Sequence, residues 1–409
     1  MRAPLPSTSL WPIGLAIYLL MLPVTGVVPV LEELTGGRHP GLSDFSKHLF
    51  MVANMLAAVL LAPLAGRLSD RLGRRQPIIV SVMLANALVL MVLSLDAPYG
   101  VHLLLRFFDG ALHITALTLL MTMAMDRARD ARKGAWGQPG RIPGMGRAMG
   151  VAGAGLTLGT ATGAPLGGWI GQDNALHVLQ AGAVLSLLLA FWVSTLREPG
   201  HQPATPLPRR GTKDTGLPLR ELVVPYVFTF ADRLSVGFII STMTLYLRTV
   251  LGAEPGQIGL LMGSFMLPFA LLTYVFGRLA SHFRPLAMMM AGSTLYGLAL
   301  LALAFAPLPL WWWLMPAGGV AAALMFAPSL VMTARAAGDD NRAMAMGGFH
   351  AAGSLGFLLG PLTGGTILAV ASLLDREGWL AAFLIMACLQ WFCVLLFLPR
   401  LRAEIRARN

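Results

Sequence analysis

The chain has 409 residues, of which 56% are hydrophobic and only 12% are charged, and its mean hydropathy is +0.69. Soluble domains carry about 25% charged residues, so this composition excludes both a soluble protein and a membrane protein with a large soluble domain. The net charge of +11 would fit a nucleic-acid partner, but the positions of the basic residues exclude one, as shown below. Cys388 and Cys393 lie about 140° apart on one helix, so no disulfide framework or metal site is predicted.

Twelve apolar runs are long enough to cross a bilayer, which takes about 20 helical residues. Their centres lie near residues 22, 57, 87, 113, 158, 185, 237, 267, 295, 321, 356 and 389. Two long polar stretches, 126–147 and 197–220, interrupt them, and the second is rich in proline, as unstructured connectors are. The sequence therefore predicts an all-α integral membrane protein with a six-helix bundle over 1–196, a cytoplasmic linker over 197–220 and a second six-helix bundle over 221–409.

Lys and Arg are divided unevenly between the alternating loops. If both termini are cytoplasmic, the outside loops hold only four of the 30 basic residues, Arg38, Lys47, Arg248 and Arg376. Positive residues concentrate on the cytoplasmic side of membrane proteins, so we predict a multi-pass protein of the cell (inner or plasma) membrane with both termini inside. The basic loops would face anionic lipid headgroups. This explanation leaves no role for nucleic acid.

The fourth run contains "HLLLRFFDGALHIT", which begins at His102 and places ionisable residues inside an apolar helix. At 100° per residue, His102, Arg106, Asp109 and His113 share an arc of about 60°. Arg106 and Asp109 can pair at i and i+3, and Asp109 can hydrogen-bond His113 one turn further on. Because intramembrane charge is usually functional, Arg106, Asp109 and His113 are candidates for proton coupling. The alternative is a self-neutralised pair that only positions the helix. His102 is expected to be solvated near the outer surface, as are Glu32 and Glu33 at the end of the first run.

The two halves share a glycine pattern at a constant offset of 197 residues. "GVAGAGLTLGTATGAPLGG" begins at Gly150, and "GGFHAAGSLGFLLGPLTGG" begins at Gly347. Glycines four residues apart let a second helix approach closely, and Pro165 can bend the helix or free a backbone carbonyl. The predicted hinge and packing residues are Gly150, Gly159, Gly163, Pro165, Gly167, Gly168, Gly356, Gly360 and Pro361. Static close packing would use the same residues, and the sequence does not separate the two readings.

The seventh run carries "FTFADRLSVGF", with Asp232 and Arg233 in mid-span. The two side chains lie about 100° apart, so they cannot both face one neighbouring helix. Asp232 is a candidate for cation or proton binding, and Arg233 joins the proton-coupling candidates. A salt bridge between domains is the alternative for this pair.

"GRLSDRLGRR", between the second and third runs, resembles the signature of the major facilitator superfamily at Gly66, Asp70, Arg71, Gly73, Arg74 and Arg75. "LLLRFFDGA" looks like the fourth-helix motif of proton-coupled members. The Gly-rich run is similar to the antiporter motif of 12-helix drug–proton exporters, with its Gly-Pro pair loosened by Ala164. The second half departs from the signature at Ser281, where Asp70 would recur. The resemblance implies two pseudo-symmetric bundles and a conformational latch at the signature residues.

The resemblance also implies a substrate pocket between the halves, lined by the first, fourth, seventh and tenth helices. The candidates there are Met21, Thr25, Phe228, Phe230, Met315 and Phe326. A cavity lined by Met and Phe suits amphipathic molecules. These residues can equally belong to the core or face lipid.

Together these features predict a proton-coupled secondary transporter that exports small organic or amphipathic molecules by alternating access. It is expected to act as a monomer, without cofactor, metal or enzymatic activity, and without ATP, because the Gly-rich runs lack the P-loop Lys-Ser/Thr. A proton-linked uptake symporter or a uniporter on the same fold is the main alternative. A lipid-modifying membrane enzyme would need a cluster of metal-binding acids that the sequence lacks, and a sensor would need no substrate flux.

Overall fold

The computed structural model describes residues 9–72, 75–134, 145–196, 219–280, 282–336, 342–374 and 378–406, without the side chains of 62–72, 128–134, 145–147, 149 and 342–344. All regular elements in this part of the chain are helical. Eleven spans within it are long and apolar enough to cross a membrane. The predicted fifth helix is 26 residues long but too glycine-rich to be among those eleven. The all-α membrane fold predicted from the sequence is confirmed.

The chain divides into two compact units, one of Met1–Val30 and Ala53–Arg210, the other of Leu31–Val52 and Gly211–Asn409. The segment Leu31–Val52 thus groups with the second unit, although the predicted domain bounds place it in the first. The predicted linker lies outside the described residues up to position 218, so its lack of structure stays a prediction.

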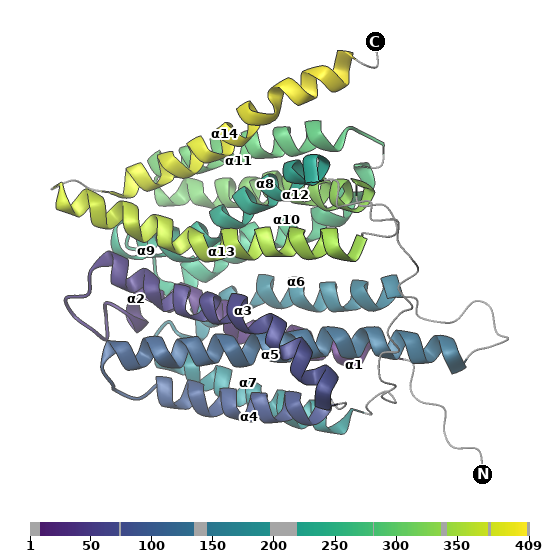
Figure 1. Cartoon of the computed structure of the whole chain (residues 1–409). Helices are drawn as coiled ribbons and strands as arrows, with labels where there is room; N and C mark the ends of the chain where they lie inside the picture. Colours follow the sequence, from purple (N-terminus) through teal and green to yellow (C-terminus); the bar gives the residue numbers. More distant parts are fainter. Residues whose placement is uncertain are drawn as a thin grey trace. The chain divides into compact units, whose positions relative to one another are not determined.

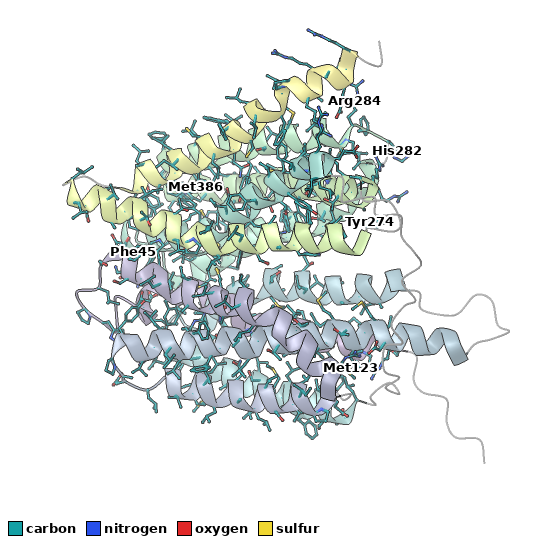
Figure 2. All side chains as sticks on the ribbon, viewed as in Figure 1. Phe45, Met123, Tyr274, His282, Arg284 and Met386 are labelled. Carbon is teal, nitrogen blue, oxygen red and sulfur yellow. The ribbon has the colours of Figure 1, made fainter. Side chains whose placement is uncertain are left out.

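The first unit is a bundle whose members are, in chain order, α1 (Trp11–Gly26), η1 (Val28–Val30), α3 (Asp44–Leu72) from Ala53 onward, α4 (Gln76–Leu93), α5 (Tyr99–Gly134), α6 (Met145–Ile170) and α7 (Leu176–Thr195). Within it α1 packs on α6. The helix α4 packs on α5 and α7 (Figure 1). Its core is aliphatic and sulfur-rich; Met123, labelled in Figure 2, is completely buried there. Large apolar side chains such as Leu88 and Phe191 point outward instead, as lipid-facing positions do.

The second unit contains α2 (Leu31–Leu34), the start of α3, α8 (Leu219–Phe238), the π-helical turn η2 (Ile239–Met243), α9 (Thr244–Thr249), α10 (Pro255–Leu279), α11 (Pro285–Phe305), α12 (Leu308–Ala336), α13 (Arg342–Leu373) and α14 (Trp379–Arg406). Here α8 packs on α13, and α11 packs on both α12 and α14. Met386, also labelled in Figure 2, belongs to this core.

The repeated glycines serve the same purpose in both units, where α6 lies against α1 and α13 lies against α8. A Cβ atom at Gly159 would lie 2.6 Å from the backbone oxygen of Tyr18, and one at Gly360 would lie 2.6 Å from the backbone nitrogen of Phe238. Gly163, Gly167 and Gly356 meet the opposing helix backbone in the same way. Gly150 has nothing within 4 Å of its hypothetical Cβ. The stripe is therefore a close-packing surface, and its role as a hinge stays a prediction.

Candidate functional site

The ionisable face of α5 points into the first unit. Arg106 is 1% exposed, and its guanidinium donates from Nη1 to Oδ2 of Asp109 at 2.5 Å. The i, i+3 pair predicted from the spacing is thus formed. A second donor reaches the same carboxylate oxygen, the side-chain amide of Asn54 on α3 at 2.9 Å. Asp109 is therefore a buried carboxylate held by one charged and one neutral donor.

Gly110 explains how Asn54 reaches this carboxylate. A Cβ atom at Gly110 would lie 2.8 Å from the Cα of Asn54, a separation that no ordinary side chain permits. The absent side chain lets the α3 backbone lie directly against α5. The glycine next to Asp109 in the sequence therefore creates the approach that supplies the second donor.

A small cavity lies beside the pair, inside the first unit. Its volume of about 10 Å³ is close to that of a single water-sized sphere. Arg106, Asp109 and His113 line one side, and Asn86 on α4 and Ser186 on α7 add polar groups on the other. Asn86 donates weakly to Ser186 at 3.4 Å. Leu and Pro side chains complete the lining, so the α5 face meets a small pocket of mixed polarity within its own bundle rather than lipid.

Two expectations for this helix are wrong. His102 is completely buried, and its Nε2 lies 3.1 Å from the backbone oxygen of Leu95, because the loop before α5 folds over it. His113 is buried as predicted, but the described residues contain no hydrogen bond between it and Asp109. Helical angle gives the face that a residue shares, not its depth or its partners.

The buried acid of the second unit, Asp232, has different surroundings from Asp109. Asp232 on α8 is 0% exposed, and neither of its carboxyl oxygens has a hydrogen-bond partner among the described residues. Its nearest cation is the Nε of Arg233, 3.5 Å from Oδ2. The hydroxyls of Thr229 on the same helix and of Tyr296 on α11 are likewise buried without a hydrogen-bond partner among the described side chains.

Arg233 keeps its Nε near Asp232, while its guanidinium group lies against aromatic rings. Its guanidinium carbon lies 4.3 Å from the ring centroid of Phe326 and 5.5 Å from that of Phe269. Cation–π contacts of this kind stabilise a cation by about 0.5–2 kcal/mol. The positive charge of Arg233 therefore interacts with two aromatic rings as well as with the Asp232 carboxyl group.

A buried polar network lies near Asp232 and joins three helices. Gln390 on α14 donates to Ser235 on α8 at 2.8 Å, and Ser293 on α11 donates to the side-chain oxygen of Gln390 at 2.7 Å. All three side chains are completely buried. These hydrogen bonds are satisfied within the network, which leaves Asp232 and Tyr296 outside it.

The predicted latch lies mostly outside the described side chains. This is so for Gly66, Asp70, Arg71, Gly73 and Arg74. Arg75, the last residue of the motif, forms an ion pair with Asp126 on α5. That contact fastens the start of α4 to the end of the fourth span.

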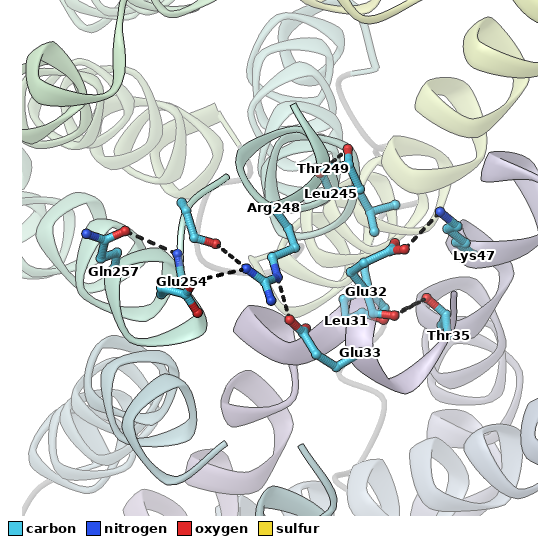
Figure 3. A network of polar contacts seen from close by, with 11 residues as sticks. Leu31, Glu32, Glu33, Thr35, Lys47, Leu245, Arg248, Thr249, Glu254 and Gln257 are labelled. Atoms are coloured by element: carbon cyan, nitrogen blue, oxygen red, sulfur yellow. Dashed lines mark hydrogen bonds and ion pairs between the residues drawn. The ribbon is translucent and has the colours of Figure 1, made fainter. Parts of the chain in front are cut away.

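A second polar network ties α2 and the start of α3 to the α8–α9 region of the second unit (Figure 3). Arg248 Nε lies 2.6 Å from Glu33 Oε1, and Lys47 Nζ lies 3.0 Å from Glu32 Oε1. The expectation that both glutamates are solvated is therefore wrong. Nearby, the ring of the buried His48 contacts Thr242 at 2.9 Å, on the π-helical turn. π-Helical turns occur frequently at functional sites.

The predicted pocket residues divide into two groups. Phe228 and Met315 are completely buried, and Phe228 packs on Phe397 of α14 at a centroid distance of 5.7 Å. Met21 is also buried, while Thr25, Phe230 and Phe326 keep partial exposure. The three partly exposed residues stay candidates for substrate contact.

Sequence reasoning missed the neutral polar residues of both sites. Asn54, Asn86 and Ser186 surround the first acid, and Tyr296 and Gln390 lie near the second. A signal was available, because uncharged polar side chains in apolar helices seek partners on neighbouring helices. Only their pairing depends on the tertiary structure.

Comparison with known proteins agrees with this architecture. Three solved structures superpose over almost the whole chain: a variant of the nucleoside transporter NupG (TM-score 0.78, 14% identity, 95% of this chain and 98% of that one), a bacterial homologue of the human lysosomal transporter Spinster (0.77, 16%, 96% and 96%) and a D-xylose–proton symporter (0.68, 14%, 95% and 96%). At such identities the likeness establishes the fold alone.

A curated relative, the probable vesicular acetylcholine transporter-B of Danio rerio, is 23% identical over 279 residues, which is 65% of this chain. The match covers 52% of that protein, so the chain spans about half the length of this relative. The profile of the Major Facilitator Superfamily matches residues 13–231 and 225–409. The signature between the second and third helices and the two glycine-packed units therefore have a common explanation: the chain belongs to the Major Facilitator Superfamily.

Proposed function

We propose that the chain is a proton-coupled transporter that exports small organic or amphipathic molecules by alternating access. Its family makes it a membrane transporter of small molecules rather than an enzyme. Proton coupling and the export direction are the parts that we propose. Asp232 carries the first of these, because it is a completely buried acid whose carboxyl oxygens have no hydrogen-bond donor among the described residues.

The chemistry of such a position favours proton exchange. Burying a carboxylate that has no hydrogen-bond donor, and whose one neighbouring cation also lies over two aromatic rings, is unfavourable, whereas the protonated acid is neutral. The neutral acid is therefore the form that suits the arrangement in which Asp232 is enclosed. Any arrangement that opens this position to water would release the proton. A transporter that alternates between the two would couple proton movement to its conformational cycle.

The acid in the first unit suits a different role. Asp109 has the guanidinium of Arg106 and the amide of Asn54 in place. Both donors stabilise the ionised carboxylate. We assign this pair to positioning α5 and Asp232 to proton exchange. The candidates Arg106 and His113 then shape the polar pocket beside the pair.

Export rests on separate support. The glycine stripe of α6 resembles the antiporter motif of drug–proton exporters, and it packs directly on the α1 backbone. The name of the curated relative describes a vesicular transporter. The partly exposed Phe230 and Phe326, with the guanidinium of Arg233 over the Phe326 ring, would suit a substrate with both polar and apolar parts.

The decisive experiment measures protons and substrate together. A thermal-shift screen of amphipathic dyes on the purified chain would supply a bound probe. Addition of that probe to protein in unbuffered detergent solution should release protons from the wild type and from Asp109→Asn, but not from Asp232→Asn. Release that is equal in all three proteins would remove Asp232 from the coupling role.

Direction is tested in proteoliposomes that contain the same probe. An imposed pH gradient should drive the dye against the direction of proton flow. Movement of dye and protons in the same direction would replace export with proton-linked uptake, and movement independent of the gradient would indicate a uniporter.

A further inference from the structure

A groove of about 490 Å³ runs along the surface of the second unit where α11 packs on α12. Its apolar part is formed by Phe283 before α11, by Ala287, Met288 and Ala291 on α11, and by Leu324 on α12. Ala287 and Ala291 are four residues apart and lie on the same face of the helix. Their small side chains leave a trough with the buried Met288 beside it. The trough has the chemistry and the shape to hold an extended hydrocarbon chain.

The mouth of the groove is basic. His282 and Arg284 line it, immediately before the candidate span Pro285–Phe305 begins. Figure 2 labels both residues and shows their nitrogen-bearing side chains near the start of α11. None of the described residues that line the groove is acidic. A positive mouth at the end of a membrane span, followed by an apolar trough along that span, is complementary to a lipid with a negative headgroup.

We propose that this groove binds one anionic phospholipid, with its phosphate at Arg284 and His282 and one acyl chain along α11 past Ala287 and Ala291. Arginine suits this position because its planar guanidinium can donate two parallel hydrogen bonds to phosphate oxygens. The site is separate from the polar positions of Asp109 and Asp232. It does not depend on proton coupling or on the direction of transport.

The headgroup contact is tested by native mass spectrometry of the purified full-length chain in micelles that contain phosphatidylglycerol and phosphatidylcholine in equal amounts. The wild type should retain one phosphatidylglycerol, and Arg284→Gln should weaken this binding about tenfold, because a charge-assisted contact is lost. Arg402→Gln, on the exposed surface of α14, is the matched control and should leave binding unchanged. Equal losses in the two variants, or equal retention of the two lipids, would overturn the proposal.

The acyl contact is tested separately on α11. Ala291→Phe fills the trough and should reduce binding of the lipid, while Ala302→Phe, at an exposed position of the same helix, should not. Both variants should keep the wild-type melting temperature in lipid-free detergent, which shows that they fold. Binding of glycerol phosphate as tight as that of the lipid, or an unchanged lipid affinity in Ala291→Phe, would show that the trough holds no chain.

Discussion

Asp109 and Asp232 are both acids in the middle of membrane helices, and both are buried within their own unit, yet their surroundings differ. Asp109 has two donors at hydrogen-bond distance, one of them the guanidinium of Arg106. Asp232 has no hydrogen-bond donor among the described residues, and the charge of its neighbour Arg233 lies over aromatic rings. Burial alone therefore does not identify a proton site. In our proposal, the number of partners that an acid has in place separates a positioning pair from a group that exchanges protons.

The largest effect that separates the two regions is expected from removal of the arginines. Arg106→Ala would leave Asp109 buried beside neutral side chains alone, and breaking a buried ion pair costs about 3–5 kcal/mol. Arg233→Ala should cost about 1 kcal/mol, because its side chain is 24% exposed and mainly loses ring contacts. The free energy of unfolding in mixed detergent micelles measures both. Equal losses of unfolding free energy in the two variants would mean that both arginines contribute equally to stability, which would contradict the difference between the two acids.

Neutralisation of the acids themselves should give the next largest difference. Asp109→Asn removes the counter-charge of Arg106 but keeps an amide oxygen that can accept its hydrogen bond, so we expect a smaller loss of about 1.5–3 kcal/mol. Asp232→Asn breaks no hydrogen bond that the described residues form, and its stability should stay within about 0.5 kcal/mol of the wild type. Thermal unfolding of the two variants side by side gives the comparison. A larger loss for Asp232→Asn would show that its carboxyl group has partners after all.

Much of this contrast could be predicted from the sequence, and the reason for the remainder is physical. Hydropathy predicted the membrane helices. The rotation of about 100° per helical residue placed Arg106, Asp109 and His113 on one buried face. The same rule placed Asp232 and Arg233 on different sides. The partners could not be predicted, because Asn54 and Tyr296 come from other helices whose register is set by packing. The close approach of α3 at Gly110, which brings Asn54 to the carboxylate, became evident only in the structure.

Uncharged polar side chains near the two acids should give a smaller difference in stability. Asn54→Ala removes one hydrogen bond from Asp109 and should cost about 1 kcal/mol. Thr229→Val is the counterpart near Asp232, where the hydroxyl is buried without a hydrogen-bond partner among the described residues. Thr229→Val should change the free energy of unfolding by close to zero, because valine keeps the shape of the side chain and no hydrogen bond is broken. Melting temperatures of both variants check this, and a fall for Thr229→Val that matched Asn54→Ala would contradict the difference between the sites.

The smallest expected effect belongs to Tyr296, and it tests the comparison most directly. Its hydroxyl is buried on α11 without a hydrogen-bond partner among the described residues. Tyr296→Phe removes only that hydroxyl, so the free energy of unfolding should be unchanged or should rise by up to about 1 kcal/mol, since an unsatisfied polar group leaves the interior. A loss of more than 1 kcal/mol would mean that the hydroxyl forms a hydrogen bond, and Asp232 is the nearby acid that could accept it. Asp232 would then be a held carboxylate like Asp109, and proton exchange would have to be assigned to another group.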